Sequence, residues 1–266
     1  MIKLGFIAEN DISKLACDCR FAAENGYSGL EFNFWGNAKD LTLDTVKGMK
    51  AILDTYSIEC SSLGLWGWNH TSTDHDERTA ALAQLDKFID FAEALDTKLF
   101  MTGGGQIEGG YDANLAAFGQ VFPGRIAKLE EAGIPLAMYA VHGASFLDSM
   151  EAYEKLWAVY PTVGMKIDPA NLRGVGIEYL PFFRDHAKMM YEVHIKEAIE
   201  MDGNPWASQP AAGMGDIAWG KIFAFLYESD WEKYMVVEPH GQLWGVGERR
   251  WKMLKLTQRH ISQFII

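Results

Sequence analysis

The sequence has few cysteines and few positive charges. Its 266 residues include three cysteines whose spacing fits no zinc motif, so we expect reduced thiols in the core. Lys and Arg number 24 against 36 Asp and Glu, and the net charge of −12 argues against nucleic acid or an anionic membrane as partner. The sequence contains no apolar run of about 18 residues, and no basic segment with a cleavage site at its beginning. We therefore expect a cytoplasmic protein that binds neither membranes nor nucleic acid.

The chain also lacks a Pro/Ser-rich linker or a block of like charge that would mark a second domain. Short apolar segments typical of buried strands alternate with amphipathic segments typical of helices. The strands are predicted at residues 2–7, 28–34, 58–65, 97–105, 134–139, 163–168, 189–194 and 234–238. The helices are predicted at 11–26, 41–56, 75–95, 114–132, 147–159, 177–187, 217–229 and 247–263. Eight such units over residues 1–266 predict a single (β/α)8 TIM barrel rather than an open doubly wound sheet. An irregular barrel with one degraded unit is the alternative.

Three predicted strands in a row end in a residue that can bind a metal or move a proton: Asp168, His194 and Glu238. The carboxyl ends of parallel strands emerge on one side, which is the active-site rim of a barrel. We therefore expect these side chains to converge. The polar and aromatic residues that follow the strands are Glu31, Trp35, Trp66, Trp68, His70, Gln106, Tyr139, His142, Asp168, Asn171, His194, Lys196, Glu197, Glu238 and His240.

Two carboxylates and an imidazole can hold a divalent cation, and this ligand set suits Mn²⁺, Mg²⁺ or Co²⁺ better than a structural zinc site. Each residue alone could instead be a satisfied buried polar group. Lys196 offers a further alternative, because it could pair with Glu238 or Asp168 without any ion. A shared ion requires the three side chains to lie within about 10 Å of one another.

Three loops near the predicted rim have distinctive compositions. Trp66, Trp68 and His70 suit stacking on the face of a sugar, although they could equally form an aromatic plug. The glycines at 103–105 lack the spacing of a dinucleotide or Walker loop, and we interpret them as a tight turn. The loop 196–216 contains glycines and a proline and has the composition of a lid or of an exposed surface loop.

At these residues the chain resembles the xylose isomerase-like TIM barrels, a superfamily of sugar isomerases and epimerases. The resemblance covers nearly the whole chain and is carried by VGMKIDPANL, EVHIKEA, GMGDIAW and MVVEPHG. It implies a Mn²⁺-like ion held by a Glu on strand five and by Asp168, His194 and Glu238 on the next three strands.

Two positions depart from the family pattern. Tyr139 stands where the strand-five Glu is expected, and Asn171 stands where the family often has His. The missing Glu is both a ligand and half of the acid/base pair in the ketose epimerases. His142, in the loop after the same strand, is the candidate for a fourth ligand.

The resemblance implies a metal-dependent enzyme that removes a proton next to the carbonyl of a sugar or polyol, as an isomerase, epimerase, or keto-sugar lyase or hydratase. Glu238 or His142 would be the base, and Lys196 would stabilise the developing negative charge. Residues expected to contact this carbohydrate are Trp66, Trp68, His70, Tyr139, Asn171 and His240. The alternative is a non-catalytic sugar-binding or partner subunit that kept the barrel. The sequence leaves a homo-oligomer open.

Overall fold

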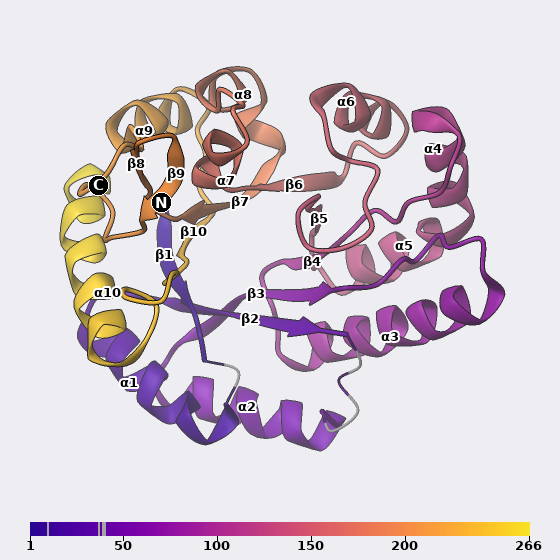
Figure 1. Ribbon diagram of the computed structural model, residues 1–266. Helices are drawn as coiled ribbons and strands as arrows, with labels where there is room; N and C mark the ends of the chain where they lie inside the picture. The colour runs from indigo at the N-terminus through magenta and orange to yellow at the C-terminus, as the bar shows by residue number, and fades with distance from the viewer. Residues whose placement is uncertain (10, 37, 39–40) are drawn as a thin grey trace.

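Eight parallel strands close into a barrel in the computed structural model, which describes residues 1–9, 11–36, 38 and 41–266. The strand order is β1-β10-β7-β6-β5-β4-β3-β2, and helices surround the strands (Figure 1). This arrangement confirms the predicted (β/α)8 barrel. The barrel strands are β1 (Lys3–Ile7), β2 (Gly29–Trp35), β3 (Glu59–Trp66), β4 (Phe100–Thr102), β5 (Leu136–Met138), β6 (Val163–Ile167), β7 (Met190–Ile195) and β10 (Tyr234–Val237).

Side-chain caps begin several of the helices. Thr42, Asp74 and Ser149 each accept a hydrogen bond from a backbone N–H of the first turn, which satisfies a donor that the helix leaves free. Among the described residues, no helix is both long and apolar enough to cross a bilayer. The α-helices are α1 (Leu15–Glu24), α2 (Leu43–Thr55), α3 (His75–Ala94), α4 (Gly110–Val121), α5 (Pro123–Glu131), α6 (Met150–Val159), α7 (Pro169–Gly174), α8 (Leu180–His186), α9 (Trp219–Glu228) and α10 (Gly247–Ile261). Short 3-10 turns lie at Ile12–Lys14, Ala187–Met189 and Ser262–Phe264.

Several predicted boundaries differ from the structure. The helix expected at 114–132 is two helices, because Pro123 starts α5 and has no N–H to continue α4. The strand expected at 97–105 is β4 only over Phe100–Thr102, with an isolated bridge further along at Gly105. The sequence reading also missed α7, which begins directly after β6 with Asp168 as its N-cap.

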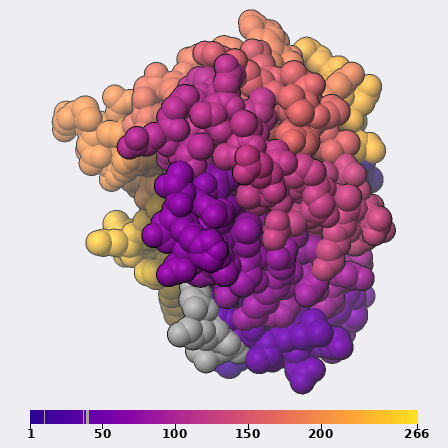
Figure 2. All heavy atoms as spheres, turned by 90° about the vertical axis from the view of Figure 1, so that its right-hand side faces the viewer, coloured from indigo at the N-terminus to yellow at the C-terminus, as the bar shows by residue number. Residues whose placement is uncertain are grey.

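The loop predicted at 196–216 contains a two-stranded hairpin, β8 (Ile199–Met201) and β9 (Asn204–Ser208). Figure 2 shows this orange segment projecting from the molecule, on the same side as the yellow loop that follows β10. Glu197 anchors the loop, since its buried carboxylate accepts hydrogen bonds from Gly213 N, Ile217 N and Trp219 Nε1. Glu197 therefore has a structural task at the rim.

Alternation along the strands places charged side chains inside the barrel. On β2, Phe34 packs against Phe88 of α3, so Glu31 and Asn33, which alternate with it, point the other way, into the barrel. Lys166 on β6 and Glu192 on β7 are also almost completely buried. The layer of the barrel interior that contains these side chains is therefore polar rather than apolar.

A buried ion pair joins the two ends of the chain. Arg250 of α10 donates to Asp18 of α1 at 3.0 Å and to the carbonyl oxygen of Ile7 at 3.0 Å. The backbone N–H of Glu9 also donates to Asp18, at 2.8 Å. The pair lies beside the seam where β1 and β10 close the barrel.

We expect Arg250→Met to lower the free energy of unfolding by about 3–5 kcal/mol, because it leaves the buried Asp18 carboxylate without its cation. Urea denaturation measures this. Adding Asp18→Asn should restore part of the loss. The control is Arg184→Met, which removes an exposed pair with Asp185 and should hardly move the midpoint. Equal losses for the two arginine variants would contradict the assignment.

Candidate functional site

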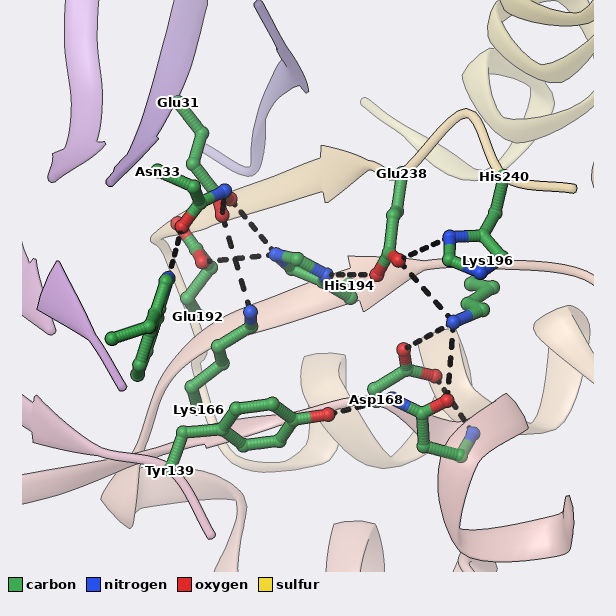
Figure 3. A network of polar contacts seen from close by, with 12 residues as sticks. Glu31, Asn33, Tyr139, Lys166, Asp168, Glu192, His194, Lys196, Glu238 and His240 are labelled. Atoms are coloured by element: carbon green, nitrogen blue, oxygen red, sulfur yellow. Dashed lines mark hydrogen bonds and ion pairs between the residues drawn. The ribbon is translucent and has the colours of Figure 1, made fainter. Parts of the chain in front are cut away.

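The ring of His194 lies between two carboxylates at the carboxyl end of the barrel (Figure 3). Its Nδ1 is 2.9 Å from Glu238 Oε2, and its Nε2 is 2.8 Å from Glu31 Oε2. The three residues come from β7, the end of β10 and β2, and all are buried. A ring that donates to a carboxylate from both nitrogens is an imidazolium. Burial opposes this charge, but Glu31 above all raises the pKa of His194 well above its ordinary value.

Glu31 is held from several sides. Asn33 Nδ2 donates to Glu31 Oε1 at 2.6 Å, and Asn33 in turn accepts from Trp66 Nε1 at 2.6 Å. Lys166 Nζ lies 3.9 Å from Glu31 Oε1 and 4.4 Å from the centre of the Tyr139 ring. Burial alone would raise the pKa of Glu31, but the charges of His194 and Lys166 lower it to about 2. Glu31 is therefore ionised at neutral pH, and its carboxylate lies next to Nε2 of His194.

Glu192 is the least satisfied member of this buried layer. Neither of its carboxylate oxygens accepts a hydrogen bond, although Oε1 lies 3.4 Å from His194 Nε2. Burial, and then the charge of Glu31, raise the pKa of Glu192 to about 7. Glu192 therefore keeps its proton to a higher pH than an ordinary glutamate does.

Lys196 connects the carboxylates on the outer side of His194. Its Nζ donates to Glu238 Oε1 at 3.2 Å and to Asn171 Oδ1 at 3.1 Å, and it lies 4.0 Å from Asp168 Oδ2. His240 Nδ1 lies 2.9 Å from the same Glu238 oxygen. Hydrogen bonds from His194 and His240 overcome the effect of burial and hold the pKa of Glu238 well below its ordinary value. The predicted pairing of Lys196 with Glu238 is thus present.

Asp168, His194 and Glu238 converge as predicted. Each offers one ligand atom, and these atoms lie within 4.8 Å of one another. Asp168 Oδ1 accepts from the backbone N–H of Asn171 at 3.0 Å, whereas Oδ2 is buried without a hydrogen-bond partner. Burial and the charge of Glu238 raise the pKa of Asp168. A carboxylate oxygen that accepts no hydrogen bond from the described residues, next to a second carboxylate and an imidazole, fits a divalent cation.

His142 lies beside this site in an aromatic enclosure. Its ring centre is 4.7 Å from that of Trp35, 5.3 Å from that of Trp66 and 5.0 Å from that of Tyr139. Burial, and then the charge of Lys166, lower its pKa to about 3, so the ring is neutral. Among the described residues, the groups of three or more potential ligands include Asp168 and Glu238 but not His142. Its role as a fourth ligand stays a prediction.

The other predicted carbohydrate contacts fall into two sets. Tyr139 and Asn171 belong to the network, because Asn171 Nδ2 donates to the Tyr139 hydroxyl at 2.7 Å. Trp68 instead donates to the carbonyl oxygen of Gly36, and His70 is fully buried with Nε2 2.9 Å from Thr102 Oγ1. Their contacts with a carbohydrate stay predictions.

The sequence reading gave no role to Glu31, Lys166 or Glu192. A signal was present, because each of the latter two lies two residues before a predicted ligand, Asp168 or His194. Residues two apart on a strand share a face. The segments KID and EVHIK therefore place a charged pair and a charged triplet on the inner face.

The sequence matches the family model described as a xylose isomerase-like TIM barrel over residues 19–253. No curated protein matches it in sequence. Similar solved structures include a D-allulose 3-epimerase from Methylomonas sp. (TM-score 0.77, 15% identity, covering 99% of this chain and 98% of that one). The IOLI protein with a bound zinc atom has a TM-score of 0.74 at 16% identity, covering 99% of each chain. The probable 3-DHS dehydratase AsbF from Bacillus anthracis has a TM-score of 0.68 at 15% identity, covering 98% of each chain. At these identities the likeness shows a shared fold.

The charge on Glu31 makes a testable contribution to stability. Its pKa is lowered from 4.5 to about 2, so this contribution is complete above pH 4.5 and is lost as the pH falls toward 2. We expect the gap in unfolding free energy between the wild type and Glu31→Gln to narrow as the pH drops from 5 to about 3. Urea denaturation at several pH values measures the gap. A gap that stays constant through this range would contradict the buried ion network.

Proposed function

The chain belongs to the xylose isomerase-like TIM barrel family, and we propose that it is a metal-dependent enzyme acting on a carbonyl-bearing sugar or polyol. The observation that carries the proposal is the convergence of Asp168, His194 and Glu238, with Asp168 Oδ2 buried and accepting no hydrogen bond from the described residues. These three residues would hold the ion through two carboxylates and His194 Nδ1, whose proton would be released when the metal binds. Mn²⁺ suits this mixed ligand set best, with Mg²⁺ or Co²⁺ as alternatives. When bound, the ion would polarise a carbonyl and an adjacent hydroxyl of the substrate.

Glu238 is our candidate for the base. Its Oε2 faces His194, while its Oε1 faces Lys196 and His240 on the outer side. One oxygen can therefore serve as a ligand while the other accepts a proton from the substrate carbon. The His142 ring packs against the Trp35, Trp66 and Tyr139 rings and is therefore part of the wall.

Lys196 and Tyr139 would stabilise negative charge on the substrate oxygens. The ammonium group of Lys196 already lies among carboxylate and amide oxygens, where it can stabilise negative charge that develops after proton removal. Burial raises the pKa of Tyr139 well above its ordinary value, so its hydroxyl keeps its proton. Tyr139 is therefore a hydrogen-bond donor and not a second carboxylate base.

Proton removal next to a carbonyl is the shared first step of isomerisation, epimerisation and β-elimination. A two-base epimerase exchanges the proton between two carboxylates, whereas here Tyr139 occupies the strand-five position. One carboxylate base together with the neutral Tyr139 hydroxyl as a hydrogen-bond donor suits elimination or hydration better than it suits epimerisation. The proposal thus places the chain closer to the lyases, such as the dehydratase whose fold it shares.

Deuterium exchange tests the reaction. The protein loaded with Mn²⁺ and incubated in heavy water with a panel of keto-sugars should place deuterium on the carbon next to the carbonyl. A chelator should abolish this exchange. Stoichiometric metal binding without exchange for any sugar would instead favour the non-catalytic sugar-binding or partner subunit.

Two matched variants test the roles of the carboxylates. Glu238→Gln keeps one ligating oxygen and loses the base, so exchange should fall roughly 10²- to 10⁴-fold at saturating metal. Asp168→Asn should weaken metal binding first and recover part of its activity at high metal concentration. Both are assayed across a metal titration. Full activity of Glu238→Gln at saturating Mn²⁺ would move the base to a histidine.

A further inference from the structure

A cavity of about 610 Å³ opens beside the candidate metal site. Its lining includes the buried Asp168 and the half-buried Asn171 at the inner end, and Val175, which is exposed and lies at the mouth. The volume lies within the range of pockets that enclose small molecules of drug size, about 300–1,000 Å³. A second cavity, of about 660 Å³, lies at the strand starts around Lys3 and Lys98, away from the network.

The walls of the first cavity are apolar beyond its inner end. Two of its hydroxyl groups are already engaged: the Tyr153 hydroxyl donates to the carbonyl oxygen of Met138, and the Ser149 hydroxyl bonds within the protein. Hydroxyl groups of a sugar placed against the apolar walls would lose hydrogen bonds to water without replacement. The apolar wall residues are Leu147, Met150, Met165, Leu172, Ile177 and Phe182.

Trp206 of β9 joins the cavity to the catalytic rim. Its indole lines the cavity and lies with its ring centre 5.4 Å from Lys196 Nζ. Gly174 at the end of α7 makes room for it, since a Cβ there would lie 2.1 Å from Trp206 Cζ2. Arg173 fixes the hairpin against α7 through Glu200 and Asp216, each at 3.1 Å. The indole is thus held as a flat wall between the polar site and the apolar cavity.

We propose that this cavity takes an apolar, planar substituent of the substrate. The ligand would then be a carbohydrate or polyol joined to an aromatic group, rather than a free sugar. This inference rests on the proposed function, because it assigns the carbohydrate end to Asp168, Asn171 and Lys196. The aromatic end would lie along Trp206 and the aliphatic walls, where burial of its surface favours binding.

Matched pairs of phenyl and methyl glycosides, each with one ring hydroxyl oxidised to a ketone so that the carbonyl of the proposed substrate is present, test the inference. Calorimetric titration of pairs covering the common hexoses, on metal-free and Mn²⁺-loaded protein, should show the phenyl glycoside binding roughly 10- to 100-fold more tightly for at least one sugar. Equal affinity within every pair, or no binding of any pair, would overturn the proposal.

Three variants test whether the preference for phenyl over methyl glycosides arises in this cavity. Trp206→Ala removes a wall and should abolish most of the phenyl preference, and Gly174→Ala should reduce it by displacing the indole without touching the metal site. Trp251→Ala is the control, since this tryptophan of α10 packs against Phe21 and is not among the residues that line the cavity. A preference unchanged in both cavity variants, or lost equally in Trp251→Ala, would overturn the assignment. If only the proposed reaction is wrong, the phenyl preference persists while metal-dependent deuterium exchange is absent.

Discussion

The burial of a charged imidazole between two carboxylates is the interaction on which this end of the barrel depends. Glu31 and Glu238 each hold one nitrogen of His194, and all three side chains are almost fully removed from water. Loss of either carboxylate would leave a buried charge without compensation. The surrounding network contains more carboxylates than cations, and one Asp168 oxygen has no hydrogen-bond donor among the described residues. A further cation between Asp168 and Glu238 would correct both the charge and the missing contact.

Two properties of the fold produce this arrangement: the alternation of side chains along each strand and the common direction of the strands. Parallel strands bring their carboxyl ends to one rim, and alternation aims every second side chain at the barrel axis. The same rule aligns Glu192 and His194 on β7 with Lys196 just beyond its end, from the buried layer out to the rim. Carboxylates in the deeper layer can orient the histidine ring, as carboxylates behind metal-binding histidines commonly do. Under the proposed function, scaffold stability and metal affinity would share residues, and Glu31 would contribute to both.

The barrel and the convergence of Asp168, His194 and Glu238 were predictable because both follow from short local sequence patterns. Each strand is an apolar run, and each of these residues stands at the end of one. Glu31 was harder to interpret, because a single carboxylate on a strand does not show which face it occupies. The apolar cavity could not be predicted at all. It depends on Trp206 lying against Gly174, a contact made by a hairpin whose path the sequence does not reveal.

The most direct test is a crystal structure of the protein with Mn²⁺, using the anomalous signal of the ion. The account predicts one strong peak at roughly 2.0–2.5 Å from Asp168 Oδ2, His194 Nδ1 and a Glu238 oxygen, with Lys196 moved away and Glu31 still bonded to Nε2. A structure in which Lys196 still bridges Asp168 and Glu238 at saturating Mn²⁺, with no peak between them, would contradict it.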